Sequence, residues 1–245
     1  AKGVEAQTRK LMQVCRMRNT PVIIFVNKLD REGQDPFDIL EELEQELQIS
    51  TRPLSWPINM GSRFKGVYLL HDNSLNLFEA DKTKKAAEYI NINDITNPDL
   101  DMIIGEADAN KLREDVELIQ GVFEPFDVNL YEDGLLAPVF FGSALNNFGV
   151  QEMLDTFVKI APSPKPRHTD IREIEPMESK MTGFIFKIHA NLDPNHRDRI
   201  AFLRVCSGTF ERNKFYLHSR TNKKMRFSNP YTFLADSKEV TQFAY

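Results

Sequence analysis

The sequence predicts a mixed α/β protein followed by a smaller all-β part, and three observations lead to this prediction. Residues 22–26 form a buried apolar run between two segments with helical spacing, and residues 136–141 form a second apolar run. Apolar strands that alternate with amphipathic helices are typical of a parallel sheet covered by helices. Beyond residue 180 the chain instead shows short strand-like segments at intervals of about 8–14 residues, as in a small antiparallel barrel.

The first part begins with a predicted helix over residues 4–18. Its apolar stripe has five positions: Val4, Leu11, Met12, Val14 and Cys15. The strand over 22–26 follows, and its near-continuous apolar character indicates burial on both faces. Asp35-Pro36 is typical of an N-cap with proline in the first helical turn, so a second amphipathic helix is expected from there to about Ile49.

Residues 51–132 interrupt this alternation and are predicted to form an inserted α+β subdomain. Short strands and turns are expected first, and one or two helices are expected between about residues 97 and 121. The strand over 136–141 resumes the alternation, and a helix follows Gly149. The predicted first domain therefore covers residues 1–162.

A proline-rich linker is predicted between the two parts. Four prolines fall between residues 162 and 176, too many for a regular element. We therefore place the linker at 163–180 and an incomplete β-barrel domain at 181–245. The barrel part holds 11 Lys and Arg against 5 Asp and Glu, although the whole chain has a net charge of −5. Such asymmetry can accompany contact with nucleic acid, and a solvated surface is the simpler alternative.

The composition argues against several classes of protein. No run approaches the roughly 18 apolar residues of a membrane-spanning helix, and the first residues lack the apolar core of a secretory signal. The two cysteines, Cys15 and Cys206, form no C-x-x-C pair, so a zinc or redox motif has no support. A reducing cytoplasm is the expected location.

Each of the two buried strands ends in a short polar motif. These motifs are Asn27-Lys28-Leu29-Asp30 and Ser143-Ala144-Leu145. The Asp30 carboxylate could accept two hydrogen bonds from the adjacent ring N–H and exocyclic amine of guanine, a pair that adenine lacks. The stem of Lys28 could cover the base, Asn27 could brace neighbouring loops, and the second motif could give a backbone N–H to the guanine carbonyl. The alternative interpretation is ordinary turn chemistry, which Asn and Asp favour.

Two other motifs of nucleotide-binding proteins bear on this interpretation. No glycine is followed by lysine, so the chain contains no G-x-x-x-x-G-K-[ST] phosphate loop. Asp30-Arg-Glu-Gly33 fits the D-x-x-G form of a GTPase switch, but it follows the base-reading motif instead of preceding it. We interpret it as a turn that leads into the helix at Asp35.

With these motifs the chain resembles the translational GTPases. N-K-x-D and S-A-L are general GTPase signals, and AKGVEAQTRKLM before NKLDRE resembles the helix after the second switch of elongation-type factors. The insert between these two motifs contains WPI and FKGVYLL, and it narrows the resemblance to translational GTPases that have an extra subdomain at this position. The segment MTGFIFKIHANLDPNHRDRIAFLRVCSG is most similar to the bacterial peptide chain release factor 3 group.

The resemblance implies the C-terminal part of a P-loop-type GTPase domain with an inserted α+β subdomain, followed by a truncated antiparallel β-barrel, the second domain of translation factors. Six residues match the guanine-contacting positions of the family: Asn27, Lys28, Asp30, Ser143, Ala144 and Leu145. GTP or GDP is the implied ligand, with only its guanine moiety held by these residues. The phosphate loop, both switches and the Mg ligands of the family have no counterpart here. No catalytic residue and no metal ligand is therefore assigned, and this fragment is expected to be inactive without the rest of a full-length GTPase.

The implied partners are the ribosome, including ribosomal RNA, and the codon-reading release factors, whose departure after peptide release the parent protein would promote. The implied location is the cytoplasm, with no membrane or DNA partner. Two alternatives stay open. One is a translocation-type elongation factor fragment, and the other is a nucleotide-independent RNA- or ribosome-binding module.

Three further features of the sequence bear on function. Residues 195–199, Asn-His-Arg-Asp-Arg, could contact RNA phosphate or form a solvated turn. Trp56 could stack on a base but is better explained as a core anchor of the insert. The spacing of His71, His168, His189 and His218 is unlike that of metal ligands.

Overall fold

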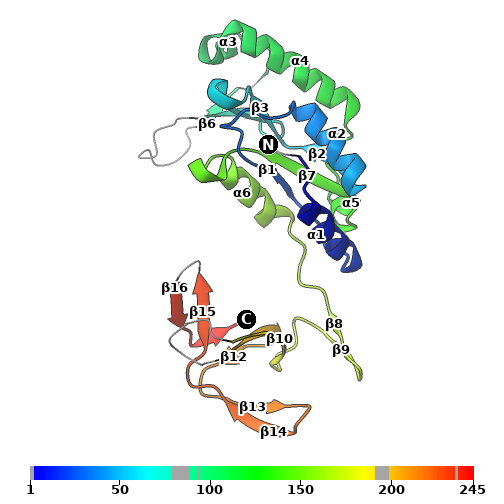
Figure 1. Cartoon of the computed structure of the whole chain (residues 1–245), viewed down its shortest axis with the longest axis vertical. Coiled ribbons are helices and arrows are strands. Elements are labelled where there is room, and N and C mark those ends of the chain that lie inside the picture. The colour runs from blue at the N-terminus through cyan, green and yellow to red at the C-terminus, as the bar shows by residue number, and fades with distance from the viewer. Residues whose placement is uncertain (1–2, 79–88, 93, 191–198, 235–236) are drawn as a thin grey trace. The chain divides into compact units, whose positions relative to one another are not determined.

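The computed structural model describes residues 3–78, 89–92, 94–190, 199–234 and 237–245. The chain divides into two compact units, the first ending at Pro162 and the second beginning at Ser163 (Figure 1). Each unit is described by itself.

A three-stranded parallel sheet forms the centre of the first unit. Its strands are β1 (Ile24–Val26), β7 (Leu136–Phe141) and β2 (Ser50–Pro53), in the order β1-β7-β2. All six residues of β7 are buried, which explains its continuous apolar sequence. In register, Val26 lies beside Phe141, so β1 and β7 end at the same edge of the sheet.

The strand β2 departs from the sequence-based prediction, which places residues 51–132 in the insert. It pairs with β7 instead, Thr51 lying beside Ala137 and Pro53 beside Val139. The polar sequence Ser-Thr-Arg-Pro gives no apolar signal for a central sheet. Hydrogen bonds made by its side chains stabilise the strand in place of apolar contacts. Arg52 Nη1, for example, donates to the Phe123 carbonyl oxygen at 2.8 Å.

The insert is an antiparallel meander with two helices beside it. Its strands are β3 (Ser55–Ile58), β4 (Gly66–Leu69), β5 (Ser74–Leu77) and β6 (Tyr89–Asn91), with the short helix η1 (Gly61–Arg63) after β3. The helices are α3 (Asp99–Ile104) and α4 (Glu106–Val122), which lie together in Figure 1. The predicted apolar face of α4 is confirmed, because Leu112, Val116 and Ile119 are buried.

Trp56 is a core anchor, as predicted. It is 1% exposed, and its ring lies 4.5 Å from that of Phe37 and 5.4 Å from that of Phe141. Its indole Nε1 donates to Asp115 Oδ2 at 2.9 Å, although burial raises the pKa of Asp115. Trp56 therefore packs the insert onto the central sheet.

Four more helices belong to this unit. They are α1 (Ala6–Met17), α2 (Pro36–Leu47), α5 (Val128–Glu132) and α6 (Val150–Ile160), with the short helix η2 (Ala144–Asn146) before α6. The N-cap of α2 is as predicted, with Asp35 Oδ1 accepting from Phe37 N at 2.9 Å. The predicted stripe of α1 is only partly right, since Val4 and Met12 are buried whereas Leu11 and Val14 are more than half exposed.

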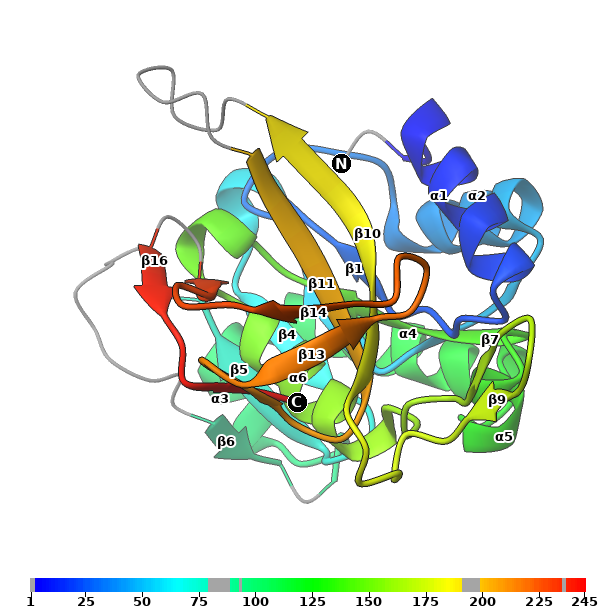
Figure 2. The same ribbon diagram turned by 90° about the horizontal axis from the view of Figure 1, so that it is seen from below.

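The second unit is built from antiparallel strand pairs, as expected for the barrel part. The strands are β10 (Thr182–Ala190) with β11 (Arg199–Ser207), β12 (Phe210–Glu211) with β17 (Phe243–Ala244), β13 (Phe215–His218) with β14 (Lys223–Arg226), and β15 (Tyr231–Leu234) with β16 (Ser237–Val240). The long ribbon of β10 and β11 is seen best in Figure 2. The strands β12, β16 and β17 are too short or too polar to have been predicted.

The linker contains one regular element that its prolines did not suggest. The strands β8 (Arg167–His168) and β9 (Glu173–Ile174) pair antiparallel around a turn. Arg172, in this turn, forms an ion pair of 2.6 Å with Glu178, which follows β9. None of the described helices has both the length and the apolar character needed to cross a membrane.

Candidate functional site

The two predicted motifs lie side by side, because they follow adjacent parallel strands. The carbonyl oxygen of Val26 accepts from Gly142 N at 3.0 Å, and the carbonyl oxygen of Gly142 accepts from Leu29 N at 3.1 Å. Pairing thus continues past the last residues of β1 and β7 and fixes the separation of the two loops. Ligands of open α/β sheets bind at this edge, beyond the carboxyl ends of the strands.

The first loop turns sharply at Lys28. Its φ angle of 71° is left-handed, which is uncommon for a residue with a side chain. Arg31 N donates to the Lys28 carbonyl oxygen at 3.1 Å and closes the turn, while Leu29 is 1% exposed and anchors it in the core. Because Leu29 points inward, Lys28 is exposed and Asp30 is only half-buried. The residues after Asp30 form bends before α2, as predicted for the D-x-x-G sequence.

Asn27 joins the two loops. Its Oδ1 accepts from Lys28 N at 2.7 Å and from Ala144 N at 2.9 Å, across 117 residues of sequence. The first bond holds the left-handed turn, and the second holds the start of the Ser143 loop. The bracing role suggested for Asn27 is thus present in the geometry.

The second loop is a closed turn stabilised by its own backbone. Ser143 N donates to the Phe148 carbonyl oxygen and Phe148 N donates to the Ser143 carbonyl oxygen, both at 3.0 Å. Ser143 is 1% exposed, whereas Ala144 is exposed and Leu145 is 71% exposed. Of the three residues predicted to serve a ligand, Ser143 therefore has a structural role, and Ala144 and Leu145 face solvent. A ligand carbonyl that accepts from Ala144 N must replace Asn27 Oδ1 as the acceptor.

Glycines allow the second loop to close tightly. A Cβ on Gly142 would overlap the Phe148 carbonyl oxygen and would lie 2.8 Å from Phe25 Cζ. Gly149 has φ 76° and precedes α6. The loop can therefore approach the end of β1 closely only with glycine at position 142.

The insert also supports both loops, which sequence reasoning missed. Gly61 N donates to the Leu29 carbonyl oxygen at 2.9 Å. The rings of Phe64, Phe78 and Phe148 form a cluster with centroids 5.1–5.5 Å apart. Phe64 and Phe78, which follow η1 and β5, could indicate burial, but no local signal identifies the loops that they contact.

The remaining predicted residues are dispersed. Residues 195–198 lie outside the described part of the chain, and Arg199 is exposed at the start of β11. His71 pairs with Asp72 at 3.1 Å, and His218 Nδ1 lies 2.7 Å from Thr221 Oγ1. Within the described residues, no group of three or more His, Cys, Asp or Glu side chains is arranged to hold a metal ion.

Comparison with protein-family models gives two matches. The model of the elongation factor Tu GTP binding domain matches residues 1–163. The model of elongation factor G domain 2 matches residues 180–245. The two loops at the ends of β1 and β7 lie within the first match, and β10 to β17 lie within the second.

Proposed function

The chain belongs to the translational GTPases, with an elongation factor Tu-type GTP binding domain followed by elongation factor G domain 2, and on this basis we propose that its paired loops recognise guanine. Binding of a guanine nucleotide is a property of the matched domain, and the assignment to particular residues is our proposal. The observation that carries it is the hydrogen bond from Ala144 N to Asn27 Oδ1, which places the two motifs in one site.

The proposed contacts follow from the chemistry of each group. The half-buried carboxylate of Asp30 accepts from the ring N–H and the exocyclic amine of guanine. The exposed stem of Lys28 covers the face of the base. Ala144 N, with Leu145 beside it, exchanges Asn27 Oδ1 for the guanine carbonyl oxygen as its acceptor when the base binds. Adenine would leave the carboxylate without its two donors, so the site would bind adenine more weakly than guanine.

The phosphates and magnesium require residues other than these. None of the 11 glycines is followed by lysine, so the loop that cradles phosphates is not encoded here. We propose that the phosphate loop, the switches and the Mg²⁺ ligands belong to a part of the protein outside residues 1–245. Without those groups, residues 1–245 alone would not hydrolyse GTP.

The role that we propose is in translation termination in the cytoplasm, where the intact GTPase promotes departure of codon-reading release factors from the ribosome. The support is the resemblance of residues 181–208 to peptide chain release factor 3. A translocation factor is the second candidate, because residues 180–245 match elongation factor G domain 2.

Contact with ribosomal RNA is proposed for the hairpin of β13 and β14. Residues 212–234 contain six Lys and Arg and no Asp or Glu. All four residues of β14 are exposed, including Lys223, Lys224 and Arg226. An exposed basic ribbon of this kind suits phosphate contacts, which set affinity but not sequence specificity.

Two experiments test these proposals. A titration of the chain with fluorescent GDP, competed by GTP and by ATP, should give a dissociation constant no tighter than about 1 mM, because the phosphate contacts are absent. Micromolar binding displaced by GTP but not ATP would show that residues 1–245 hold the phosphates as well. That result would contradict the proposal that the phosphates are bound by another part of the protein.

The intact GTPase is then tested on ribosomes stalled at a stop codon with a labelled release factor. GTP-dependent departure of the label without movement of the mRNA supports the termination role. Movement of the mRNA instead would identify a translocation factor. Ribosome binding that is the same with and without guanine nucleotide would favour the nucleotide-independent module.

A further inference from the structure

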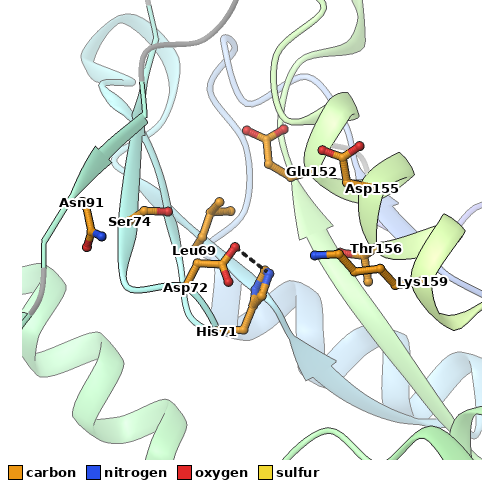
Figure 3. A pocket seen from close by; sticks show the side chains of 9 residues that line it. All are labelled: Leu69, His71, Asp72, Ser74, Asn91, Glu152, Asp155, Thr156 and Lys159. Carbon is orange, nitrogen blue, oxygen red and sulfur yellow. Dashed lines mark ion pairs between the residues drawn. The ribbon is translucent and has the colours of Figure 1, made fainter.

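A cleft of about 370 Å³ lies between α6 and the insert sheet, away from the two loops (Figure 3). Its walls come from β4 and the turn after it, β5, β6 and one face of α6. The volume falls within the range of roughly 300–1,000 Å³ that is usual for small-molecule sites. The proposed guanine site uses none of the residues that line it.

Glu152 in this cleft is buried without enough donors. The residue is 5% exposed, and its Oε1 accepts a hydrogen bond from Asn76 Nδ2. Its Oε2 and the Oδ1 of Asn76 are both buried and have no hydrogen-bond partner. A buried carboxylate is costly unless it is paired and hydrogen-bonded, so these two acceptors indicate that donors are missing.

The cleft has an excess of negative charge around Glu152. Asp72 and Asp155 also line it, with one ammonium group, Lys159. Asp72 already pairs with His71 at 3.1 Å, which leaves Glu152 and Asp155, one turn apart on α6, as the lining carboxylates without an ion-pair partner among the described residues. Figure 3 shows these two carboxylates near each other at one end of the cleft. A ligand at this end must be a cation that donates hydrogen bonds.

The surroundings favour an organic cation over a metal ion. No set of three or more His, Cys, Asp or Glu side chains in the described parts of the chain is placed to coordinate a metal. The carboxylates of Glu152 and Asp155 both line the cleft and lie one turn apart on α6, which suits a planar group with several N–H donors. Guanidinium has five such donors and is more weakly hydrated than ammonium, so its burial costs less.

We propose that this cleft binds a guanidinium group, with Glu152 and Asp155 as its carboxylate partners. The group is either part of a small molecule or the side chain of an arginine in a partner protein. Binding supplies the Glu152 carboxylate with a donor that it lacks. The inference stands independently of guanine recognition, because it rests on residues outside the two loops.

The test is a titration of the ¹⁵N-labelled chain followed by NMR, with two guanidinium probes in separate arms. The probes are agmatine and an acetylated, amidated Gly-Arg-Gly peptide. We expect shifts at residues 69–76 and 152–159 with a dissociation constant of about 1 mM for the better probe. Tighter binding of agmatine would identify a small molecule, and tighter binding of the peptide would identify an arginine side chain.

Variants separate charge recognition from structural effects. Glu152→Gln should weaken binding by about tenfold or more, and Asp155→Asn should weaken it less, because Asp155 is the less buried carboxylate. Glu117→Gln removes the same charge from an exposed position of α4 and should leave binding unchanged. If Glu152 has only a structural role, Glu152→Gln will change the melting temperature and leave the affinity for the probe as it was.

Three outcomes would overturn the proposal. The first is no shift with either probe up to about 10 mM, roughly ten times the expected dissociation constant. The second is equal binding of n-butylamine, which would show that any cation suffices. The third is binding of Mg²⁺ that depends on Glu152 while agmatine has no effect.

Discussion

Replacing Asn27 with alanine should loosen the loop that contains Ala144, although the two residues are 117 positions apart. Asn27 Oδ1 accepts from Lys28 N at 2.7 Å and from Ala144 N at 2.9 Å, and alanine offers neither amide an acceptor. Each hydrogen bond of this kind contributes about 0.5–1.5 kcal/mol net. Lys28 and Ala144 are exposed, so water can replace the lost acceptor and the lower half of that range applies.

The expected loss for the loop is therefore about 1 kcal/mol, from the Ala144 bond alone. A local stability lowered by that amount corresponds to amide exchange that is roughly fivefold faster. Hydrogen exchange of Ala144 N, measured by NMR, reports this directly. The exchange of amides in β7 should stay unchanged, because the strand pairing does not involve Asn27.

Asn110→Ala is the matched control. Asn110 accepts a bond from Arg113 on the same helix and touches neither loop. This variant should leave Ala144 exchange unchanged. If Asn27→Ala also leaves it unchanged, Asn27 does not hold the loops together and the proposed site loses its main structural support.

Three further predictions concern other parts of the structure. Gly142→Ala should destabilise the first unit by roughly 1–3 kcal/mol, since the added Cβ overlaps the Phe148 carbonyl oxygen. Gly121→Ala, in α4 with nothing within 4 Å of its Cβ position, should be neutral or stabilise by up to about 1 kcal/mol. Equal urea midpoints for these two variants would contradict the tight approach at Gly142. Arg172→Ala should raise the pKa of Glu178 from about 2 toward the ordinary 4.5, because the guanidinium hydrogen bond is the largest cause of the lowering. NMR titration of the Glu178 carboxyl tests this, and a pKa that stays near 2 would assign the effect to its other partners. Burial raises the pKa of Asp115, so the folded state holds that proton more tightly than the unfolded state. Below the ordinary pKa of an aspartate, the contribution of Asp115 to the free energy of unfolding is complete, and it is lost as the pH rises through the raised pKa of the folded state. Asp115→Asn should remove this part of the pH dependence of stability, measured by urea unfolding at several pH values. An unchanged pH dependence would exclude Asp115 as its source.

Much of the fold could be predicted because some segments carry their own signal. The apolar run of β7 is buried throughout, and the segments of β10 and β11 match strands of the predicted bounds. The prediction that residues 22–26 are buried on both faces is wrong, because β1 lies at the edge of the sheet and only Val26 is buried, whereas residues 22–25 are half-buried. The strand β2 carries no such signal, because its Ser-Thr-Arg-Pro sequence is stabilised by side-chain hydrogen bonds to distant groups. Leu11 and Val14 have the spacing of a buried stripe but are exposed, since periodicity does not show what packs on a face.

The placement of the two loops was predictable, because the carboxyl ends of adjacent parallel strands lie at the same edge of a sheet. That rule alone places Asp30 and Ala144 near each other. The pairing of Gly61 with Leu29 and the ring cluster of Phe64 and Phe148 were not predictable, because they join segments that no local pattern relates. The burial of Glu152 on the amphipathic helix α6 was not predictable either, because it depends on contact with a distant segment of the chain.

The central claim is that these loops distinguish guanine from adenine, and an NMR titration of the chain with GMP and with AMP tests it most directly. With GMP in the millimolar range, we expect shifts of the amides of Lys28, Asp30 and Ala144, because a base with two donors engages Asp30. AMP at the same concentration should leave them unchanged. Equal shifts with both nucleotides, or shifts confined to residues outside the two loops, would contradict guanine recognition at this site.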